Sequence, residues 1–258
     1  MVRNLPTISR IKAISPLLIL AIVAAGASSV QAADPVANQT WAAELPLVEQ
    51  IVARMVAQGQ WQKLALLEYR AMRRFQASNT RFKVESTLEV MTTFRQPDTL
   101  ESWVLKQEGS NLIRQRVFDK ILEEEKENQL KKERIQNDVL PANYHFEFAG
   151  NEDYKGRKSY QLSIVPKRKS KYLLRGSIWI DAEDFAISRI HGSPSKRVSF
   201  WTLRTEVDRQ YERVGKFWLT KSIDSASDIF LAGHSTLSIS SSYQKVQASM
   251  EIPVDPVN

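Results

Sequence analysis

The chain of 258 residues contains no cysteine. A disulfide, a thiol nucleophile and a thiolate metal site are therefore excluded. A bacterial lipoprotein signal also needs a cysteine directly after its cleavage point, so lipid anchoring of that kind is excluded as well. The nine glycines are isolated from one another, and no phosphate-cradling loop is present.

The sequence also has little that points to catalysis. There is no G-x-S-x-G elbow, and the histidines have no tight spacing such as H-x-x-x-H. These histidines are His145, His191 and His234. A metal site built from them with Asp181 or Asp224 would need long-range folding, and scattered histidines on strands are usually surface residues. Asp181 and Asp184 are better explained as turn formers than as an acid–base pair. We expect neither an enzyme nor a cofactor.

The amino terminus has the pattern of a secretory signal. A basic region with Arg3, Arg10 and Lys12 precedes a short apolar run from Ile14 to Ala25. This run is shorter than the roughly 20 residues that a membrane-spanning helix needs. An uncleaved interfacial anchor is the weaker interpretation, and the stronger one is export.

The small residues Val30-Gln31-Ala32 fit a cleavage site between Ala32 and Ala33. We expect residues 1–32 to be removed and residues 33–258 to form one β-rich domain in the periplasm. The signal holds three of the 36 Lys and Arg and none of the 29 Asp and Glu, so a net charge of +7 falls to +4. That charge is too mild to argue for nucleic acid, although it is compatible with anionic lipid head groups.

The first part of the mature chain has helical periodicity. Apolar residues recur every three or four positions from Trp41 to about Gln58. Gly59 is expected to interrupt the helix, and Trp61 to Leu67 to form another turn or two. Such an amphipathic helix normally covers one face of a sheet.

The period then changes to two. From Phe82 to Phe94 the even positions are mostly apolar and the odd positions mostly polar, as in an antiparallel sheet with one wet face. Tyr69 to Ala77 either forms the preceding strand or prolongs the helix. About eleven strands follow from this pattern and from the spacing of turn signals, which is typical of a sandwich or barrel. The others are expected at Ser102–Lys106, Leu112–Phe118, Tyr144–Phe148, Tyr160–Ile164, two within Arg175–Gly192, Ser199–Tyr211, Lys216–Asp224, Ala226–Leu231 and Ser235–Val246.

One charged segment interrupts the strands. Val117 to Gln136 is rich in helix formers and has no glycine or proline. Its apolar stripe is narrow, so the helix should lie on the surface. It is either a lid over a cavity or a solvated helix packed lightly on the sheet, and charge runs more often mark the second.

The segment Arg175 to Gly192, RGSIWIDAEDFAISRIHG, forms a predicted hairpin around Asp181–Asp184. Together with Asn143–Phe146, Gly156–Tyr160, LSIVPKRKSKYLLRG, HGSPSKRVSFW and GKFWL, it resembles the outer-membrane lipoprotein-sorting (LolA-like) family. The resemblance covers roughly Tyr69 to Val246. One departure is Thr220, which stands where relatives often have proline.

The resemblance implies a mainly β fold: a half-open antiparallel β-barrel of about eleven strands with an N-terminal helix and a charged lid helix. It implies a periplasmic carrier or chaperone, expected as a monomer, that binds acyl chains of lipids or lipoproteins and delivers them toward the outer membrane. A sensor of envelope stress with the same fold is the alternative. A gating arginine is also implied, for which Arg70, Arg73, Arg74 and Arg81 stand in the right region.

On this interpretation the apolar strand positions form the wall of a cavity, with Ile178 and Ile180 facing inward and Trp179 outside or at the rim. The expected wall residues are Val84, Leu88, Val90, Phe94, Trp103, Leu105, Leu162, Ile164, Ile178, Ile180, Phe217 and Leu219. For any one such residue a filled core is the more common account, and the wall of an open cavity is the alternative. The basic run Lys167–Lys171 at a hairpin tip has two interpretations too: it keeps an edge soluble or meets lipid phosphates.

Overall fold

The computed structural model describes residues 47–97, 99–130, 137–200 and 202–249. The expected signal, its cleavage site between Ala32 and Ala33, and residues 131–136 of the charged segment lie outside the described residues. In the part of the chain that the structure describes, no helix is both long enough and apolar enough to cross a membrane.

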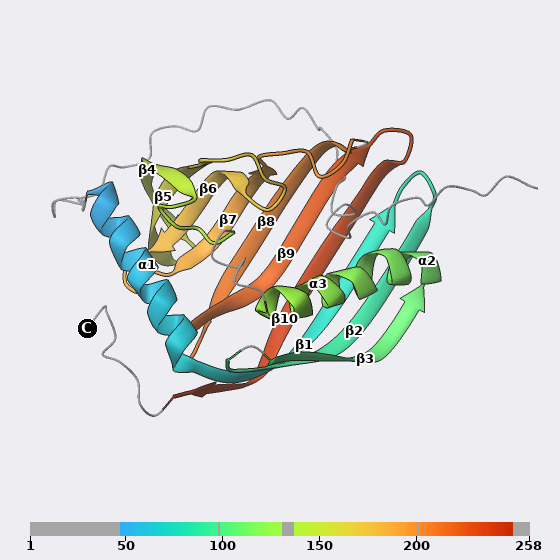
Figure 1. The fold of residues 1–258 in the computed structure, drawn as a ribbon, viewed down its shortest axis with the longest axis horizontal. Coiled ribbons are helices and arrows are strands. Elements are labelled where there is room, and N and C mark those ends of the chain that lie inside the picture. The colour runs from blue at the N-terminus through green and yellow to red at the C-terminus, as the bar shows by residue number, and fades with distance from the viewer. Residues whose placement is uncertain (1–46, 98, 131–136, 201, 250–258) are drawn as a thin grey trace, which may run out of the picture.

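Ten antiparallel strands form one curled sheet (Figure 1). Their order is β3-β2-β1-β10-β9-β8-β7-β6-β5-β4, so the first and last strands pair in the middle of the sheet. The sheet remains open because β3 and β4 are its edges, and the mainly β, half-open fold class is confirmed. The strands are β1 (Leu66–Asn79), β2 (Val84–Arg95), β3 (Thr99–Gly109), β4 (Tyr144–Tyr154), β5 (Arg157–Pro166), β6 (Leu174–Asp181), β7 (Ile187–Pro194), β8 (Thr202–Val214), β9 (Phe217–Ile229) and β10 (Gly233–Ala248).

Two expected strands are wrong. The segment expected as Leu112–Phe118 is helical, as α2 (Asn111–Ile113) and the π-helical turn η2 (Arg114–Phe118). The Ser110 hydroxyl caps this helix by accepting from the Ile113 amide, and Phe118 is fully buried against the sheet. The segment Ala226–Leu231 is largely the end of β9 rather than a separate strand.

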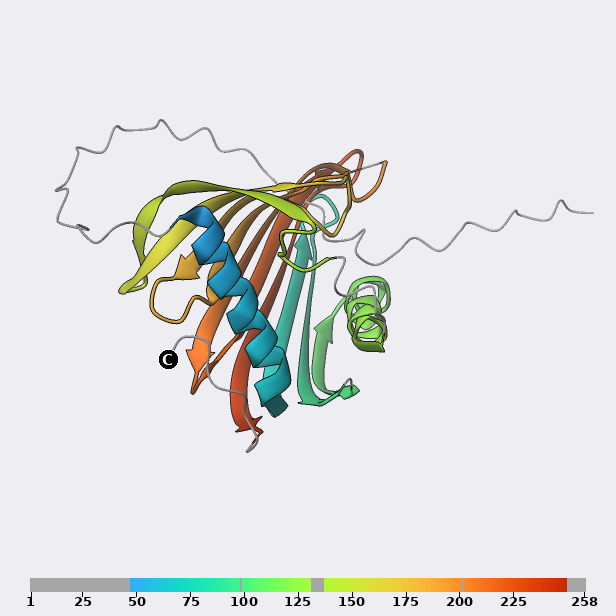
Figure 2. The ribbon, with the colours of Figure 1, turned by 60° about the vertical axis from the view of Figure 1, so that its left-hand side comes forward.

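Two longer helices accompany the sheet: α1 (Val48–Ala65) and α3 (Asp119–Leu130). Figure 2 shows α1 lying across the hollow of the curled sheet. Gly59 does not interrupt α1, contrary to expectation. The cost of glycine in a helix, about 1 kcal/mol, is smaller than the gain from burying Met55 and Trp61 on either side of it.

A single row of cross-strand partners crosses the whole sheet on the face that both helices cover. From β4 to β3 the row is Phe148, Leu162, Ile178, Ile190, Arg209, Ile223, Ile239, Phe75, Leu88 and Gln107. Eight of these ten residues are apolar, because alternate positions of each strand point to the same face. We call this the apolar row, and its one charged member is Arg209.

The glycines Gly176 and Gly192 let β6 and β7 approach each other closely. The two residues are cross-strand partners. A Cβ atom added at Gly176 would lie 2.0 Å from the carbonyl oxygen of His191 and 2.6 Å from the Cα of Gly192. Both neighbours are backbone atoms, so the strands would have to separate.

We therefore expect Gly176→Ala to lower the free energy of unfolding by about 1–3 kcal/mol, measured by urea denaturation. The matched control is Gly59→Ala in α1, where an added Cβ meets nothing within 4 Å. This control should raise the free energy of unfolding by about 0.5–1 kcal/mol, since alanine is the better helix former. Equal effects of the two alanines would contradict the close approach of β6 and β7.

Candidate functional site

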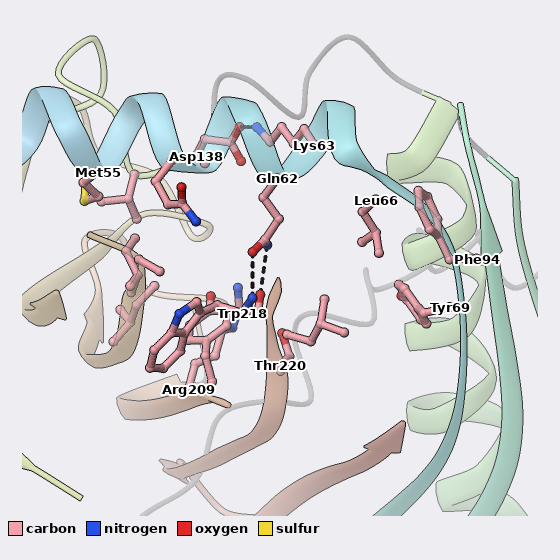
Figure 3. A pocket seen from close by; sticks show the side chains of 18 of the residues that line it. Met55, Gln62, Lys63, Leu66, Tyr69, Phe94, Asp138, Arg209, Trp218 and Thr220 are labelled. Carbon is pink, nitrogen blue, oxygen red and sulfur yellow. Dashed lines mark hydrogen bonds and ion pairs between the residues drawn. The ribbon is translucent and has the colours of Figure 1, made fainter. Parts of the chain in front are cut away.

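Two adjoining cavities lie on the covered face of the sheet, the larger beneath α1 and the smaller between the segment 137–139 and strands β6 to β9. The larger has a volume of about 650 Å³ and the smaller about 310 Å³. They share the segment 137–139 together with Ile190 and Arg209, so these residues separate one cavity from the other. Ligand pockets commonly have volumes of about 300–1,000 Å³. The larger cavity is shown in Figure 3.

Helix α1 is held at both ends and forms one side of the larger cavity. At its start, Ile51, Val52 and Met55 pack on the apolar residues of β5, β6 and β7. At its end, Trp61 stacks on Phe217, with ring centroids 5.7 Å apart. These contacts fix the helix over the sheet by burial of apolar surface.

A polar contact then defines how far α1 stands from β9. Gln62 Nε2 donates to the Trp218 carbonyl oxygen over 2.9 Å, and the Trp218 amide donates to Gln62 Oε1 over 2.7 Å (Figure 3). The paired hydrogen bonds satisfy a backbone group that would otherwise face the cavity.

The segment that follows α3 crosses beside α1 and closes part of the cavity. Lys63 Nζ of α1 lies 2.6 Å from Asp138 Oδ2, and Val139 packs on the core beneath α1. Asp138 and Val139 line both cavities. The segment 137–139 is thus joined to α1 by one ion pair and to the sheet by one apolar side chain.

The helical turn η2 and helix α3 cover the other part of the same face. Phe118 packs on Phe75 of β1, with ring centroids 5.7 Å apart. Arg73, also on β1, donates two hydrogen bonds to Glu125 of α3, from Nη1 over 2.7 Å and from Nη2 over 2.8 Å. Burial alone would lower the pKa of Arg73, but the charge and hydrogen bonds of Glu125 outweigh it, so the pKa lies above its ordinary value.

The wall between the cavities contains buried polar atoms without partners. The Nε atom of Arg209 and the Oε1 atom of Gln58 are shielded from solvent and make no hydrogen bond. Arg209 does hydrogen-bond Tyr211, whose electrostatic effect is the main cause that raises the pKa of Arg209 above its ordinary value. A raised pKa keeps the guanidinium charged. The wall that the two cavities share therefore combines the apolar Val139 and Ile190 with a permanent cation.

The structure distributes the twelve expected wall residues over three regions. Leu162, Ile164, Ile178 and Ile180 form a packed core beneath α1, and Leu88 and Val90 form another beneath η2. Phe94 and Leu219 line the larger cavity, and Phe217 lies beside them against Trp61. Val84 is half-buried at the start of β2.

The two expected residues on β3 lie apart from the others. Trp103 and Leu105 are 49% and 54% exposed. Trp103 is paired with Met91, whereas Val104 is paired with Val90, so Trp103 lies on the outer face of the sheet. Trp179 is buried on that outer face as well, where its Nε1 donates to Glu152 over 2.5 Å.

Several residues of the site were not predicted. Gln58, Gln62, Tyr69, Arg209 and Tyr211 all line the larger cavity. A signal for Arg209 was present, since Val207, Arg209 and Tyr211 alternate as one face of an expected strand. Of the arginines proposed as a gate, Arg73 faces the covered side and binds Glu125, whereas Arg74 is paired with Glu89 on the outer face.

Asp181, one of the two carboxylates weighed as an acid–base pair, has a structural role in this fold. Asp181 accepts hydrogen bonds from Arg157 and, through Oδ1, from the amides of Glu183 and Asp184, which confirms it as a turn former. Among the residues that the structure describes, no three His, Asp or Glu side chains gather as they would around a metal ion.

Comparisons with known proteins give a family and several solved structures. A family of unknown function, DUF5686, matches residues 141–246. No curated protein matches the chain. A DUF1329 family protein from Desulfovibrio piger is similar in structure, with 12% identity and a TM-score of 0.40, over 82% of this chain and 97% of that one.

Two other similar structures bear names of the family that the sequence resembles. One is an outer membrane lipoprotein-sorting protein domain from Vibrio parahaemolyticus, with 9% identity, a TM-score of 0.39, and coverage of 81% of this chain and 95% of that one. The other is a LolA superfamily protein from Nitrosomonas europaea, with 8% identity, a TM-score of 0.34, and coverage of 80% and 94%.

The pairing of Arg73 with Glu125 gives an asymmetric prediction. Glu125→Met leaves a buried charge without a partner and should lower the free energy of unfolding by about 3 kcal/mol. Arg73→Met leaves Glu125 without its partner, but the Glu125 side chain is 30% exposed and can be hydrated. The free energy of unfolding should therefore fall by only about 1 kcal/mol. Urea unfolding measures both losses, and amide hydrogen exchange should show α3 opening more often in each variant.

The control is Glu123→Met, which removes an exposed partner of Lys120 on the same helix. It should change the free energy of unfolding by less than about 0.5 kcal/mol. If all three variants lost the same amount, the buried pair would not be what holds α3 on the sheet.

Proposed function

We propose that the protein is a periplasmic carrier that holds acyl chains of a lipid or lipoprotein between α1 and the sheet and delivers them toward the outer membrane. It acts as a binding protein and not as an enzyme, and it needs no cofactor. In this proposal residues 1–32 are a cleaved signal, residues 33–258 work as one unlipidated domain, and the carrier acts as a monomer.

The observation that carries the proposal is the pair of adjoining cavities on the apolar row. Apolar ligands need wide apolar surface and few polar anchors. Phe94, Leu219 and Ile190 provide such surface in the larger cavity, and Val198, Val207 and Ile223 do so in the smaller one. Because the two cavities adjoin, one acyl chain can extend from the larger into the smaller once the segment 137–139 moves aside.

The covering elements suit such a role. The segment 137–139 is attached to α1 through the single Lys63–Asp138 ion pair, and α3 is attached through Arg73 and Glu125. The Lys63–Asp138 pair joins partly exposed side chains and contributes little to stability, so it can open at small cost, whereas opening α3 must break the buried Arg73–Glu125 pair. In this proposal Arg73 is the gating arginine, and α3 with the segment 137–139 is the lid.

Filling the cavity should prevent binding. Thr220 lines the larger cavity (Figure 3), and Thr220→Phe should lower the affinity for cis-parinaric acid, a fluorescent fatty acid, by at least about tenfold. Fluorescence titration measures the affinity, and thermal unfolding verifies that the variant is folded.

The matched control is Thr87→Phe on β2. Thr87 is the partner of Gln76 and lies on the outer face, between residues that face the core. Its substitution should leave the affinity unchanged. An unmodified protein that takes up no fatty acid and co-purifies with no lipid from the periplasm would refute the carrier. The sensor alternative would be favoured if the bound lipid were not delivered anywhere and only changed the affinity of this protein for a membrane protein.

A further inference from the structure

Arg209 stands in the middle of an otherwise apolar surface. It occupies the fifth place in the apolar row, between Ile190 on β7 and Ile223 on β9. It also lines both cavities. An arginine at such a place loses hydration that only a paired anion or a set of hydrogen bonds can replace.

The fold supplies no such anion. In the part of the chain that the structure describes, Arg209 forms no ion pair, and its electrostatic neighbours are Tyr211, Tyr144 and Glu125. Glu125 is already bound through both its oxygens to Arg73. The two arginines lie on the same face, but only Arg73 has its charge balanced.

Arg209 can reach a ligand with the rest of its guanidinium rather than with its shielded Nε atom, because its side chain is only half-buried and lines both cavities. The guanidinium donates to Tyr211, while its Nε remains without a partner and shielded from solvent. Guanidinium N–H groups bind carboxylate and phosphate oxygens in a planar, bidentate manner. An anion-binding group therefore stands between the mainly apolar smaller cavity and the larger cavity, whose wall is mixed.

We propose that Arg209 binds the oxyanion of an anionic amphiphile, a carboxylate or a phosphate, whose hydrocarbon chain lies on the apolar row. This inference rests on the proposed carrier function and adds the class of ligand to it. Arg209 thus selects charged amphiphiles over neutral ones of the same length.

The test compares cis-parinaric acid with its methyl ester, which has the same chain without the charge. The unmodified protein should bind the acid roughly 10- to 100-fold more tightly than the ester. Arg209→Met should remove that difference by lowering the affinity for the acid and not for the ester. Arg209→Lys should keep part of the difference. The control Arg204→Met removes an exposed arginine from the outer face of the same strand and should change neither affinity.

Thermal unfolding separates this role from a structural one. Because the charge is unbalanced, Arg209→Met should unfold at the same temperature as the unmodified protein or higher in the absence of ligand. A lower unfolding temperature with unchanged selectivity would mean that Arg209 only supports the fold.

The other outcomes are equally distinct. Equal binding of acid and ester by the unmodified protein overturns the oxyanion site and leaves the carrier standing, whereas binding of neither refutes the carrier itself. Inorganic phosphate or acetate could instead stabilise the protein as strongly as the fatty acid does. This result would show a site for free anions and would overturn the proposal that the ligand is an amphiphile.

Independent observations support a second inference, which concerns the loops at one end of the sheet. The loops 80–83, 167–173, 195–200 and 230–232 lie along one end of the strands, the upper edge of the sheet in Figure 1. The register shows this directly, since Asn79 pairs with Ser235, Thr202 with Ile229 and Leu174 with Pro194. We call these four loops the basic rim.

The basic rim combines positive charge with exposed apolar side chains. Its loops contain eight Lys and Arg residues and no Asp or Glu. Four large apolar residues there are each more than half exposed, although such groups are normally covered. They are Phe82, Phe200, Phe230 and Leu231.

The opposite end of the sheet has a different character. Its turns carry both signs, with Glu183 and Asp184 beside Lys155 and Lys216. The smaller cavity is lined from the basic rim, by Lys171, Tyr172 and Val198. Unbalanced positive charge is therefore concentrated at the end where this cavity lies, and exposed apolar side chains stand beside it.

We infer that the basic rim docks on an anionic lipid surface, with Lys and Arg at the phosphate level and the apolar side chains in the headgroup region. Basic residues near such a surface and apolar groups that enter it are the two contributions that hold peripheral proteins on membranes. This docking does not depend on what the cavities bind.

Vesicle sedimentation tests the inference. The unmodified protein should bind vesicles of phosphatidylcholine mixed with phosphatidylglycerol, bind pure phosphatidylcholine far less, and lose binding as salt is raised. Lys196→Glu with Arg197→Glu should weaken the binding at least about tenfold. The control pair, Lys155→Glu with Lys216→Glu at the opposite end, should change it less than about twofold.

A third variant examines the apolar part. Phe230→Ser with Leu231→Ser should weaken binding to the anionic vesicles at any salt concentration. Unchanged binding in this variant, an equal loss in the control pair, or equal binding to neutral vesicles would each overturn the docking. Binding to soluble polyaspartate as strong as to the vesicles would overturn it as well, since the rim would then be a site for acidic proteins.

Discussion

The apolar row across all ten strands is the constraint on which the rest of the structure depends. A sheet of ten strands at about 4.8 Å is about 43 Å wide, whereas the 18 residues of α1 form a helix about 27 Å long. One helix therefore cannot cover the face. α1 covers β5, β6 and β7, and η2 with α3 covers β1, β2 and β10. The cavities lie between the two covers.

The same constraint explains why two arginines on one face have different surroundings. Arg73 lies under α3, where a covering helix brings Glu125 to it. Arg209 lies on β8, where Glu125 of α3 acts only through its charge and forms no ion pair with it among the described residues. A charge in a low-dielectric region is tolerated when it is paired, hydrated or used. The polar partner of Arg209 must then come from the space in front of the sheet, either water or a bound ligand.

Much of the fold follows from local pattern. The alternation in Phe82–Phe94 predicts a half-buried strand, and β2 (Val84–Arg95) is that strand. The hairpin at Asp181 follows because the carboxylate accepts from amides within its own turn. The helical segment 111–118 does not follow, since LIRQRVF fits either period, and burial of Phe118 against Phe75 decides it. This contact joins residues distant in sequence.

The candidate site was predictable only in part for a related reason. Strand periodicity identifies which residues share a face of the sheet. Whether a given part of that face is packed or open depends on how much of it α1 covers. Leu162 and Phe94 have the same apolar, alternating context, yet Leu162 lies in a packed core and Phe94 lines a cavity. Trp103 belongs to the outer face because a bulge between Glu89 and Val90, opposite Leu105, shifts the register of β3.

The pairing of the first and last strands makes the larger cavity a late product of folding. Its wall combines Tyr69 of β1 with Tyr243 of β10, whose rings meet edge to face at 5.4 Å. Burial raises the pKa of Tyr243, so its hydroxyl keeps the proton that it donates to the Thr220 carbonyl over 2.9 Å. The β1–β10 contact joins the two ends of the described chain, and such distant pairings form slowly. The wall of the larger cavity is therefore complete only when β1 and β10 have paired, which couples the shape of the cavity to the stability of the fold.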